Sequence, residues 1–155
     1  MNEYLIVKTV HVLSSAILFG TGIGTAFFGL ATALGRDART VAAVWRWVVR
    51  ADLLFTTPAV ILQPLTGFHL VQAAGFPLTS TWVVWGTVLY LVAGACWLPV
   101  LWIQVRMRGL AQAAAQSGAE LPPAFWKLLR FWVGLGIPAF VALVAVFYLM
   151  VAKPA

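Results

Sequence analysis

Charge is scarce in this chain of 155 residues: only 9% of its residues are charged, and only 4 of them are Asp or Glu. It has one cysteine, Cys96, so no intramolecular disulfide can form. It has two histidines, His11 and His69, and no HxxxH pair, so a zinc or copper site has little support. No acidic residue is expected at the depth of the histidines. A serine–histidine nucleophile would therefore lack its orienting acid.

Hydrophobic residues, in contrast, make up 63% of the chain, and its mean hydropathy is +0.96. A soluble domain of this size cannot bury so much apolar surface. Four apolar stretches are close to the roughly 20 residues that cross a bilayer, and the first is too long for a removable signal peptide. We predict one all-α domain, residues 1–155, with four transmembrane helices at Val10–Leu34, Leu53–Ala73, Trp82–Val105 and Phe131–Ala152.

The basic residues predict how these helices are oriented. Eight of the ten flank the two connections that follow the first and third apolar stretches: Arg36, Arg39, Arg46, Arg50, Arg106, Arg108, Lys127 and Arg130. The positive-inside rule makes that side cytoplasmic and places both termini outside. The net charge of +6 thus reflects topology, and we expect the lipid bilayer, not nucleic acid, as the partner. The expected location is the bacterial inner (cytoplasmic) membrane.

An amphipathic segment precedes the second stretch. Its apolar stripe is Val41, Val44, Trp45 and Val48, and arginines occupy the other face. This pattern predicts a helix that lies in the inner interface or rises from it and continues into the second span. Asp52 at the boundary is expected to pair with a nearby arginine.

Two features of the spans bear on packing. Gly20 and Gly24 lie four apart on one face of the first span, which favours close approach of a neighbouring helix, with a flat ligand as the alternative. The glycine spacing does not fit a dinucleotide loop, and no strand precedes it. In the second span, Pro58 and Pro64 each remove a backbone hydrogen bond. Gln63 is expected either to satisfy a freed carbonyl or to line a cavity.

The two histidines are the strongest candidates for chemistry. In the predicted topology His11 and His69 lie on antiparallel spans, both roughly 5–10 Å below the outer surface. Two imidazoles at one depth could ligate a haem iron, with Ser14 and Ser15 binding a haem edge or orienting His11. In the alternative interpretation, each histidine only hydrogen-bonds a carbonyl or reaches the headgroups.

Four segments resemble a family of uncharacterised bacterial four-helix integral membrane proteins. They are "KTVHVL", "RADLLFTTPAVILQPLTG", "YLVAGACWLPVLWIQVRMR" and "FYLMVAKP". The resemblance covers nearly the whole chain and implies the four-helix fold, but no activity.

More distantly, the chain is similar to the four-helix membrane protoporphyrinogen IX oxidases and their relatives, among them copper-resistance membrane domains. The shared features are Lys8-x-x-His11, the Thr56-Thr57-Pro58 run and the closing Lys-Pro. Members of that oxidase family bind haem b, and their first-span histidine is essential. The resemblance therefore implies a haem role for His11. The third span, Trp82–Val105, lacks the lysine on which that family relies, which argues against the same oxidase activity.

We therefore expect a haem b protein for electron transfer or quinone-linked redox chemistry, which makes a membrane oxidoreductase one candidate. Its cofactor-binding residues would be His11, His69, Ser14, Ser15, Gly20 and Gly24, and its iron ligands His11 and His69. A quinone, a redox partner protein, a second copy of the chain or a larger membrane complex are the candidate partners. The alternatives are an accessory membrane protein without cofactor and a small transporter with a pathway around Gln63.

Overall fold

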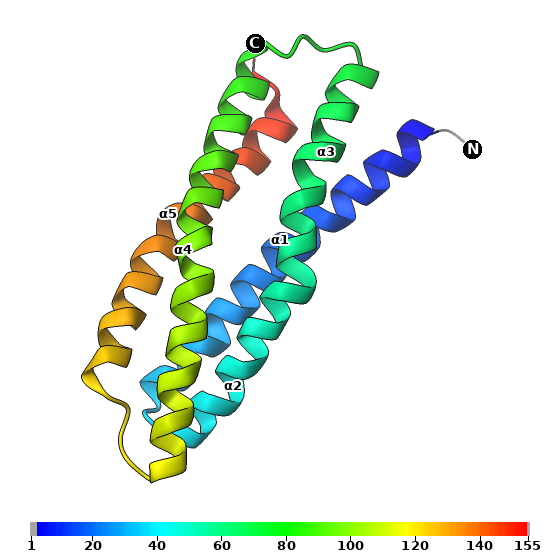
Figure 1. The fold of residues 1–155 in the computed structure, drawn as a ribbon. Helices are drawn as coiled ribbons and strands as arrows, with labels where there is room; N and C mark the ends of the chain where they lie inside the picture. Colours follow the sequence, from blue (N-terminus) through cyan, green and yellow to red (C-terminus); the bar gives the residue numbers. More distant parts are fainter. Residues whose placement is uncertain (1–2, 155) are drawn as a thin grey trace.

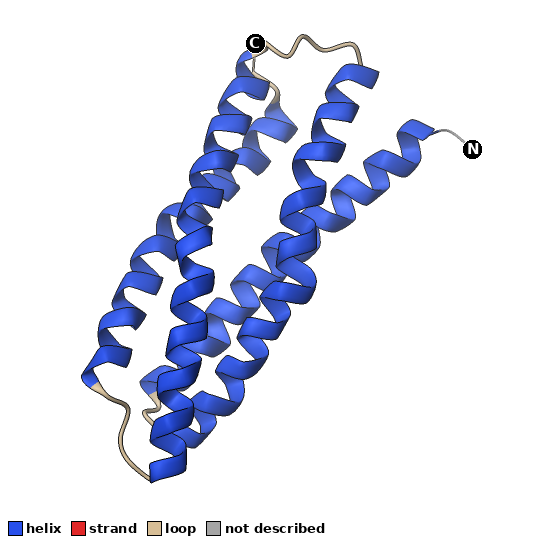
Figure 2. Ribbon diagram, in the orientation of Figure 1, coloured by secondary structure: helices blue, strands red, loops and turns tan. Residues whose placement is uncertain are grey.

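The fold was analysed in a computed structural model, which describes residues 3–154. This part of the chain is helical apart from short connections, and both ends of the chain lie at the same end of the bundle (Figures 1 and 2). The elements in order are α1 (Glu3–Leu34), α2 (Ala38–Ala51), the π-helix η1 (Asp52–Thr56), α3 (Thr57–Ala73), α4 (Thr81–Ser117) and α5 (Pro123–Ala152).

The predicted fold is confirmed: four helices, with α2, η1 and α3 continuous over Ala38–Ala73, are long and apolar enough to cross a membrane. The amphipathic segment does run directly into the second span. Its stripe is turned into the bundle, because Val41 and Trp45 are fully buried and Val48 nearly so. The segment therefore rises as part of the bundle.

A π-helical turn joins α2 to α3 where the sequence brings a proline. The N–H of Thr57 bonds to the carbonyl of Asp52, five residues back, and the Thr57 hydroxyl donates to the same oxygen over 2.9 Å. Pro58 follows at once and has no N–H to continue the ladder. Single π-turns of this kind are often found at functional sites.

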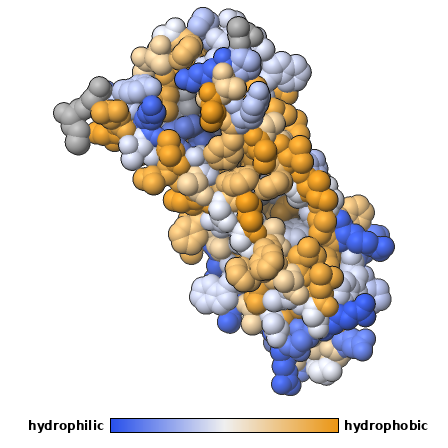
Figure 3. All heavy atoms as spheres, turned by 180° about the vertical axis from the view of Figure 1, so that it is seen from behind, coloured by the Kyte–Doolittle hydropathy of each residue, from blue (hydrophilic) through white to orange (hydrophobic). Residues whose placement is uncertain are grey.

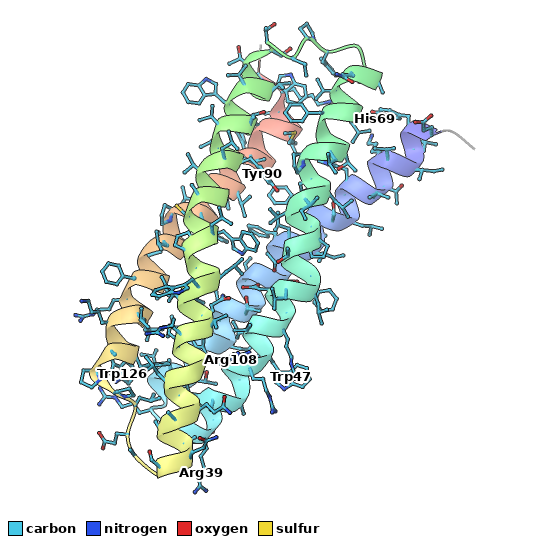
Figure 4. The ribbon with its side chains drawn as sticks, in the orientation of Figure 1. Arg39, Trp47, His69, Tyr90, Arg108 and Trp126 are labelled. Atoms are coloured by element: carbon cyan, nitrogen blue, oxygen red, sulfur yellow. The ribbon has the colours of Figure 1, made fainter. Side chains whose placement is uncertain are left out.

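The main hydrophobic core lies at the end of the bundle that carries most of the basic residues, which we call the inner end. Arg39 and Arg108 are seen there in Figure 4, and hydrophilic residues gather at this end in Figure 3. The 37-residue α4 is about 55 Å long, against about 30 Å for the hydrocarbon layer, so its inner part extends beyond the membrane. The buried core residues there include Val41, Trp45, Ile103, Met107, Phe125 and Trp132.

Further toward the opposite, outer end the helices associate as two pairs. α1 packs along α3, and α4 packs along α5, whereas α1 and α5 approach each other at few points. Figure 1 shows α1 and α3 diverging from α4 and α5 toward the end where the termini lie. A small outer cluster of Val71, Trp82 and Val83, with Leu149 and Met150, packs at this end. Between this cluster and the inner core, packing is looser.

Candidate functional site

The His11 side chain lies in the seam between α1 and α3. Its Nδ1 is 2.7 Å from the hydroxyl of Thr66, and the ring lies against Gly67. A Cβ at Gly67 would be only 3.3 Å from His11 Cε1, so the missing side chain makes room for the imidazole. His11 is thus half-buried between two helices, not directed to the headgroups.

The hydrogen bonds around Thr66 favour one tautomer of His11. The Thr66 hydroxyl has one proton, and it donates this proton to the carbonyl of Leu62 at 2.6 Å. With its proton on the Leu62 carbonyl, Thr66 accepts from His11, which favours the tautomer of the neutral ring that has its proton on Nδ1. The lone pair is then on Nε2, the nitrogen that is free to bind an electrophile or a metal ion.

Gln63 fixes the backbone and the next turn of α1. Its amide nitrogen donates to the carbonyl of His11 over 2.8 Å and to the hydroxyl of Ser14. Ser14 is buried and donates to the same His11 carbonyl, while Ser15 bonds to the carbonyl of Val12. Neither serine contacts the His11 ring; the ring partner is Thr66 of α3. Gln63 does not satisfy the carbonyl that Pro64 frees, because its amide bonds to α1. That carbonyl has another partner.

That carbonyl belongs to Val60, four residues before Pro64, and it accepts a hydrogen bond from the Tyr90 hydroxyl over 2.6 Å. Figure 4 shows Tyr90 on α4, in the region between this helix and α3. The proline thus creates an acceptor inside the bundle, and a side chain from the other helix pair satisfies it.

His69 has a different partner from His11. Its Nε2 is 3.7 Å from Oε1 of Glu3, and this is the one ion pair within residues 3–154. The sequence predicts no carboxylate near either histidine, and for His69 this prediction is wrong. Both side chains of the pair are exposed, at the outer ends of α3 and α1 (Figure 4). The structure therefore gives His11 and His69 separate surroundings.

Close helix packing at Gly20 and Gly24, which the sequence predicts, is not made within the chain. A Cβ at either position would meet nothing within 4 Å. The close approach occurs at Gly29, where a Cβ would lie 3.4 Å from the ring of Trp45 and 3.6 Å from that of Trp132. The contacts at Gly29 come from two tryptophans of other helices. The spacing of glycines within α1 therefore could not show that Gly29, and not Gly20 or Gly24, is the closely packed position.

Asp52 forms a second polar cluster, inside the bundle. Its carboxylate accepts from the Thr56 hydroxyl and from the Gln104 amide, each over 2.8 Å, and all three side chains are buried. The predicted pairing of Asp52 with an arginine is wrong. The apolar stripe of α2 continues into η1 and turns Asp52 toward α4, away from the arginine face.

A cavity of about 480 Å³ adjoins this cluster. All four spans contribute to its walls, with Asp52, Thr56 and Gln104 at one part of the lining and Tyr90 at another. Most of the remaining lining is aliphatic or aromatic. Its size is within the range of small-molecule pockets. Sequence reasoning did not predict this cavity.

A comparison with known protein families identifies the family of this chain. The model of a family described as "Predicted integral membrane protein (DUF2269)" matches residues 5–154. The chain belongs to this family. The match covers all four long helices, so the protein is a multi-pass integral membrane protein. No curated protein and no solved structure matches the chain significantly.

Proposed function

We propose that this DUF2269 protein binds one haem b in the bacterial inner membrane, with Nε2 of His11 as the axial ligand. The observation that carries the proposal is the hydrogen bond between His11 Nδ1 and Thr66, which in the favoured tautomer leaves the Nε2 lone pair for a metal ion. The resemblance of Lys8-x-x-His11 to the haem-binding oxidases supports the same residue.

The donor set fits this cofactor better than a bare metal ion. Within residues 3–154 no three His, Cys, Asp or Glu side chains gather closely enough to hold an ion. Porphyrin supplies four of the iron ligands itself, so one imidazole from the protein is sufficient. Bound haem would supply one-electron transfer, which suits exchange with a quinone or a redox partner protein.

The neighbours of His11 would then have positioning roles. Thr66 holds the ring orientation and increases the basicity of Nε2, as outer-shell partners of metal-bound histidines do. Gln63 anchors the α1 backbone at His11. Gly67 leaves the space in which the ring lies. His69, paired with Glu3, has no role in this proposal.

The test is the visible absorption spectrum of the protein purified from haem-replete cells. We expect a haem b spectrum for the wild type and its loss in His11→Ala. Thr66→Val should still bind haem, but with an affinity lower by about 10-fold, which is within the range seen when an outer-shell partner is removed. A shifted reduction midpoint in Thr66→Val would identify it as a positioning residue.

His69→Ala is the matched control, since it removes the other histidine of the same helix pair and should leave the spectrum unchanged. Circular dichroism of each variant distinguishes loss of haem from loss of fold. A wild-type protein without a haem spectrum would overturn the proposal, as would an unchanged spectrum in His11→Ala.

A further inference from the structure

Beside the cavity between the two helix pairs lies a feature that the haem proposal does not use: a buried hydrogen-bond acceptor without a donor. Gln104 is only 2% exposed, and its amide nitrogen is committed to Asp52. Its Oε1 has no hydrogen-bond partner within the described part of the chain. An unsatisfied acceptor of this kind is costly inside a membrane protein, where no bulk water can reach it.

The neighbouring groups are acceptors as well. Each Asp52 oxygen accepts one hydrogen bond, from Thr56 or from Gln104, and a carboxylate oxygen can accept a second. No lysine or arginine lines the cavity. The Asp52 end of the lining therefore calls for a hydrogen-bond donor, such as a hydroxyl group, and would disfavour an anion. Elsewhere in the lining, the indole N–H groups of Trp97 and Trp132 have no acceptor within the described part of the chain.

The other walls suit a flat ring. Trp97, Trp132 and Phe140 line the cavity and offer aromatic contacts to a ring, with one face of Phe140 already stacked on Phe19. Gly94 of α4 and Gly136 of α5 also line it, and a Cβ on either would meet nothing within 4 Å. These glycines leave space that side chains could otherwise fill.

The cavity opens toward lipid between α1 and α5. Ile23 and Phe27 of α1 and Ile137 of α5 line it, yet they are 43%, 64% and 60% exposed. Since these positions lie in the middle of apolar helices, they face the hydrocarbon layer. A molecule dissolved in the bilayer can therefore enter sideways and leave its apolar tail among the lipids.

We propose that this cavity binds a lipid-soluble aromatic alcohol, a phenol or hydroquinone with an alkyl tail, whose hydroxyl donates to an oxygen of the Asp52–Gln104 cluster. The ring lies among Trp97, Trp132 and Phe140, and the tail extends between α1 and α5. The site is separate from His11, which does not line the cavity.

The test uses 4-heptylphenol and its methyl ether, 4-heptylanisole, with native mass spectrometry of the detergent-purified protein. The two probes have the same tail and ring, but the ether cannot donate a hydrogen bond. We expect the phenol to bind about tenfold more tightly, the value of one hydrogen bond to a buried acceptor. Gly94→Leu should weaken the binding of both probes about tenfold or more, because leucine occupies the space of the ring.

Gly109→Leu is the matched control. Gly109 is on the same helix, a Cβ there also meets nothing within 4 Å, and it does not line the cavity. Both substitutions raise helix propensity alike, so only the filled cavity distinguishes them. Gly136→Leu fills the cavity from α5 and replaces Gly94→Leu if that variant does not fold.

Equal binding of phenol and anisole would overturn the proposal, because a plain lipid-chain pocket makes no such distinction. Undiminished phenol binding in both Gly94→Leu and Gly136→Leu would overturn it too, since it would locate the probe elsewhere. These results are independent of the haem spectrum, which should be unchanged in Gly94→Leu.

Discussion

At the scale of single residues, Asp52 is the group that costs most to place in this bundle, and its partners decide what its replacement does. Asp52→Ala removes the acceptor of both Thr56 and the Gln104 amide, leaving buried donors unsatisfied. We expect the free energy of unfolding to fall by about 1–3 kcal/mol. Unfolding in mixed detergent micelles with increasing dodecyl sulfate measures this loss.

Asp52→Asn is the matched control, because its side-chain oxygen still accepts from Thr56 and its amide can bond to a reoriented Gln104. It should cost clearly less than Asp52→Ala. In the double variant Asp52→Leu/Gln104→Leu, no buried amide is left without its partner. Its loss in free energy of unfolding should therefore be smaller than the sum of the losses in Asp52→Leu and Gln104→Leu. Strict additivity would show that the hydrogen bond contributes nothing to stability.

Asp37 lies outside the spans and begins α2. Its carboxylate accepts from the side chain and the backbone N–H of Thr40, and these hydrogen bonds lower the pKa of Asp37 from its ordinary value of 3.8. Since the folded state holds the lower pKa, the cap stabilises the helix fully above pH 3.8 and is lost as the pH falls through the folded value. Carbon-detected NMR titration should give a pKa below 3.8 for Asp37. In Thr40→Val, which loses the hydroxyl donor but keeps the backbone N–H, the pKa of Asp37 should rise part of the way toward 3.8. An unchanged pKa in this variant would contradict the role of the hydroxyl.

Some residue roles could be read from the sequence and others could not. His11 was a candidate because an imidazole in an apolar stretch is rare, and the structure places it in a helix seam. Its partner Thr66 is 55 residues away, and Gln104 is 52 residues from Asp52. Such pairings depend on how the helices are rotated about their axes. A single sequence records no such rotation.

At the scale of the helices, the two prolines of the second span shape the interior. Pro64 has no N–H to donate to the Val60 carbonyl, so this carbonyl accepts a hydrogen bond from the Tyr90 hydroxyl instead. Tyr90→Phe should therefore destabilise the protein by about 1–2 kcal/mol, as an unsatisfied carbonyl remains inside the bundle. The same micelle unfolding measurement checks this value.

Pro64→Ala supplies the control, because alanine restores the N–H that Val60 lacks. In that background Tyr90→Phe should cost about half as much or less, since the carbonyl keeps its helical partner. An equal loss in free energy of unfolding from Tyr90→Phe with and without Pro64 would show that the proline does not create the acceptor.

Helix existence followed from composition, but helix ends did not. The apolar stretches predicted a third span over Trp82–Val105, whereas α4 continues to Ser117, where Gly118 adopts a left-handed conformation with φ 68°. Residues after Val105 are mostly polar or small and give no span signal. Met107, Ala111 and Ala114 are nevertheless buried in the inner core, so the helix continues because it packs there.

At the scale of the whole molecule, a cavity lies between two packed clusters of the bundle. The inner core and the outer cluster surround a middle region where the helix pairs separate. Hydropathy could predict four spans, because the bilayer demands length and apolar composition. It could not predict the cavity, because lipid-facing and cavity-facing side chains are equally apolar. The hollow follows from how the two helix pairs cross.

Orientation in the membrane is the prediction that belongs to the whole chain. The basic residues gather at the inner end, so the loop with Thr79 should face outward and the loop with Ala119 the cytoplasm. In a Cys96→Ser background, a membrane-impermeant maleimide should label Thr79→Cys in intact spheroplasts. It should label Ala119→Cys only after the membrane is permeabilised. Both positions are exposed in the structure, so access to the reagent depends on the membrane alone.

The reverse labelling pattern would place His11 near the cytoplasmic surface. The electron partner of a haem bound there would then be sought on that side.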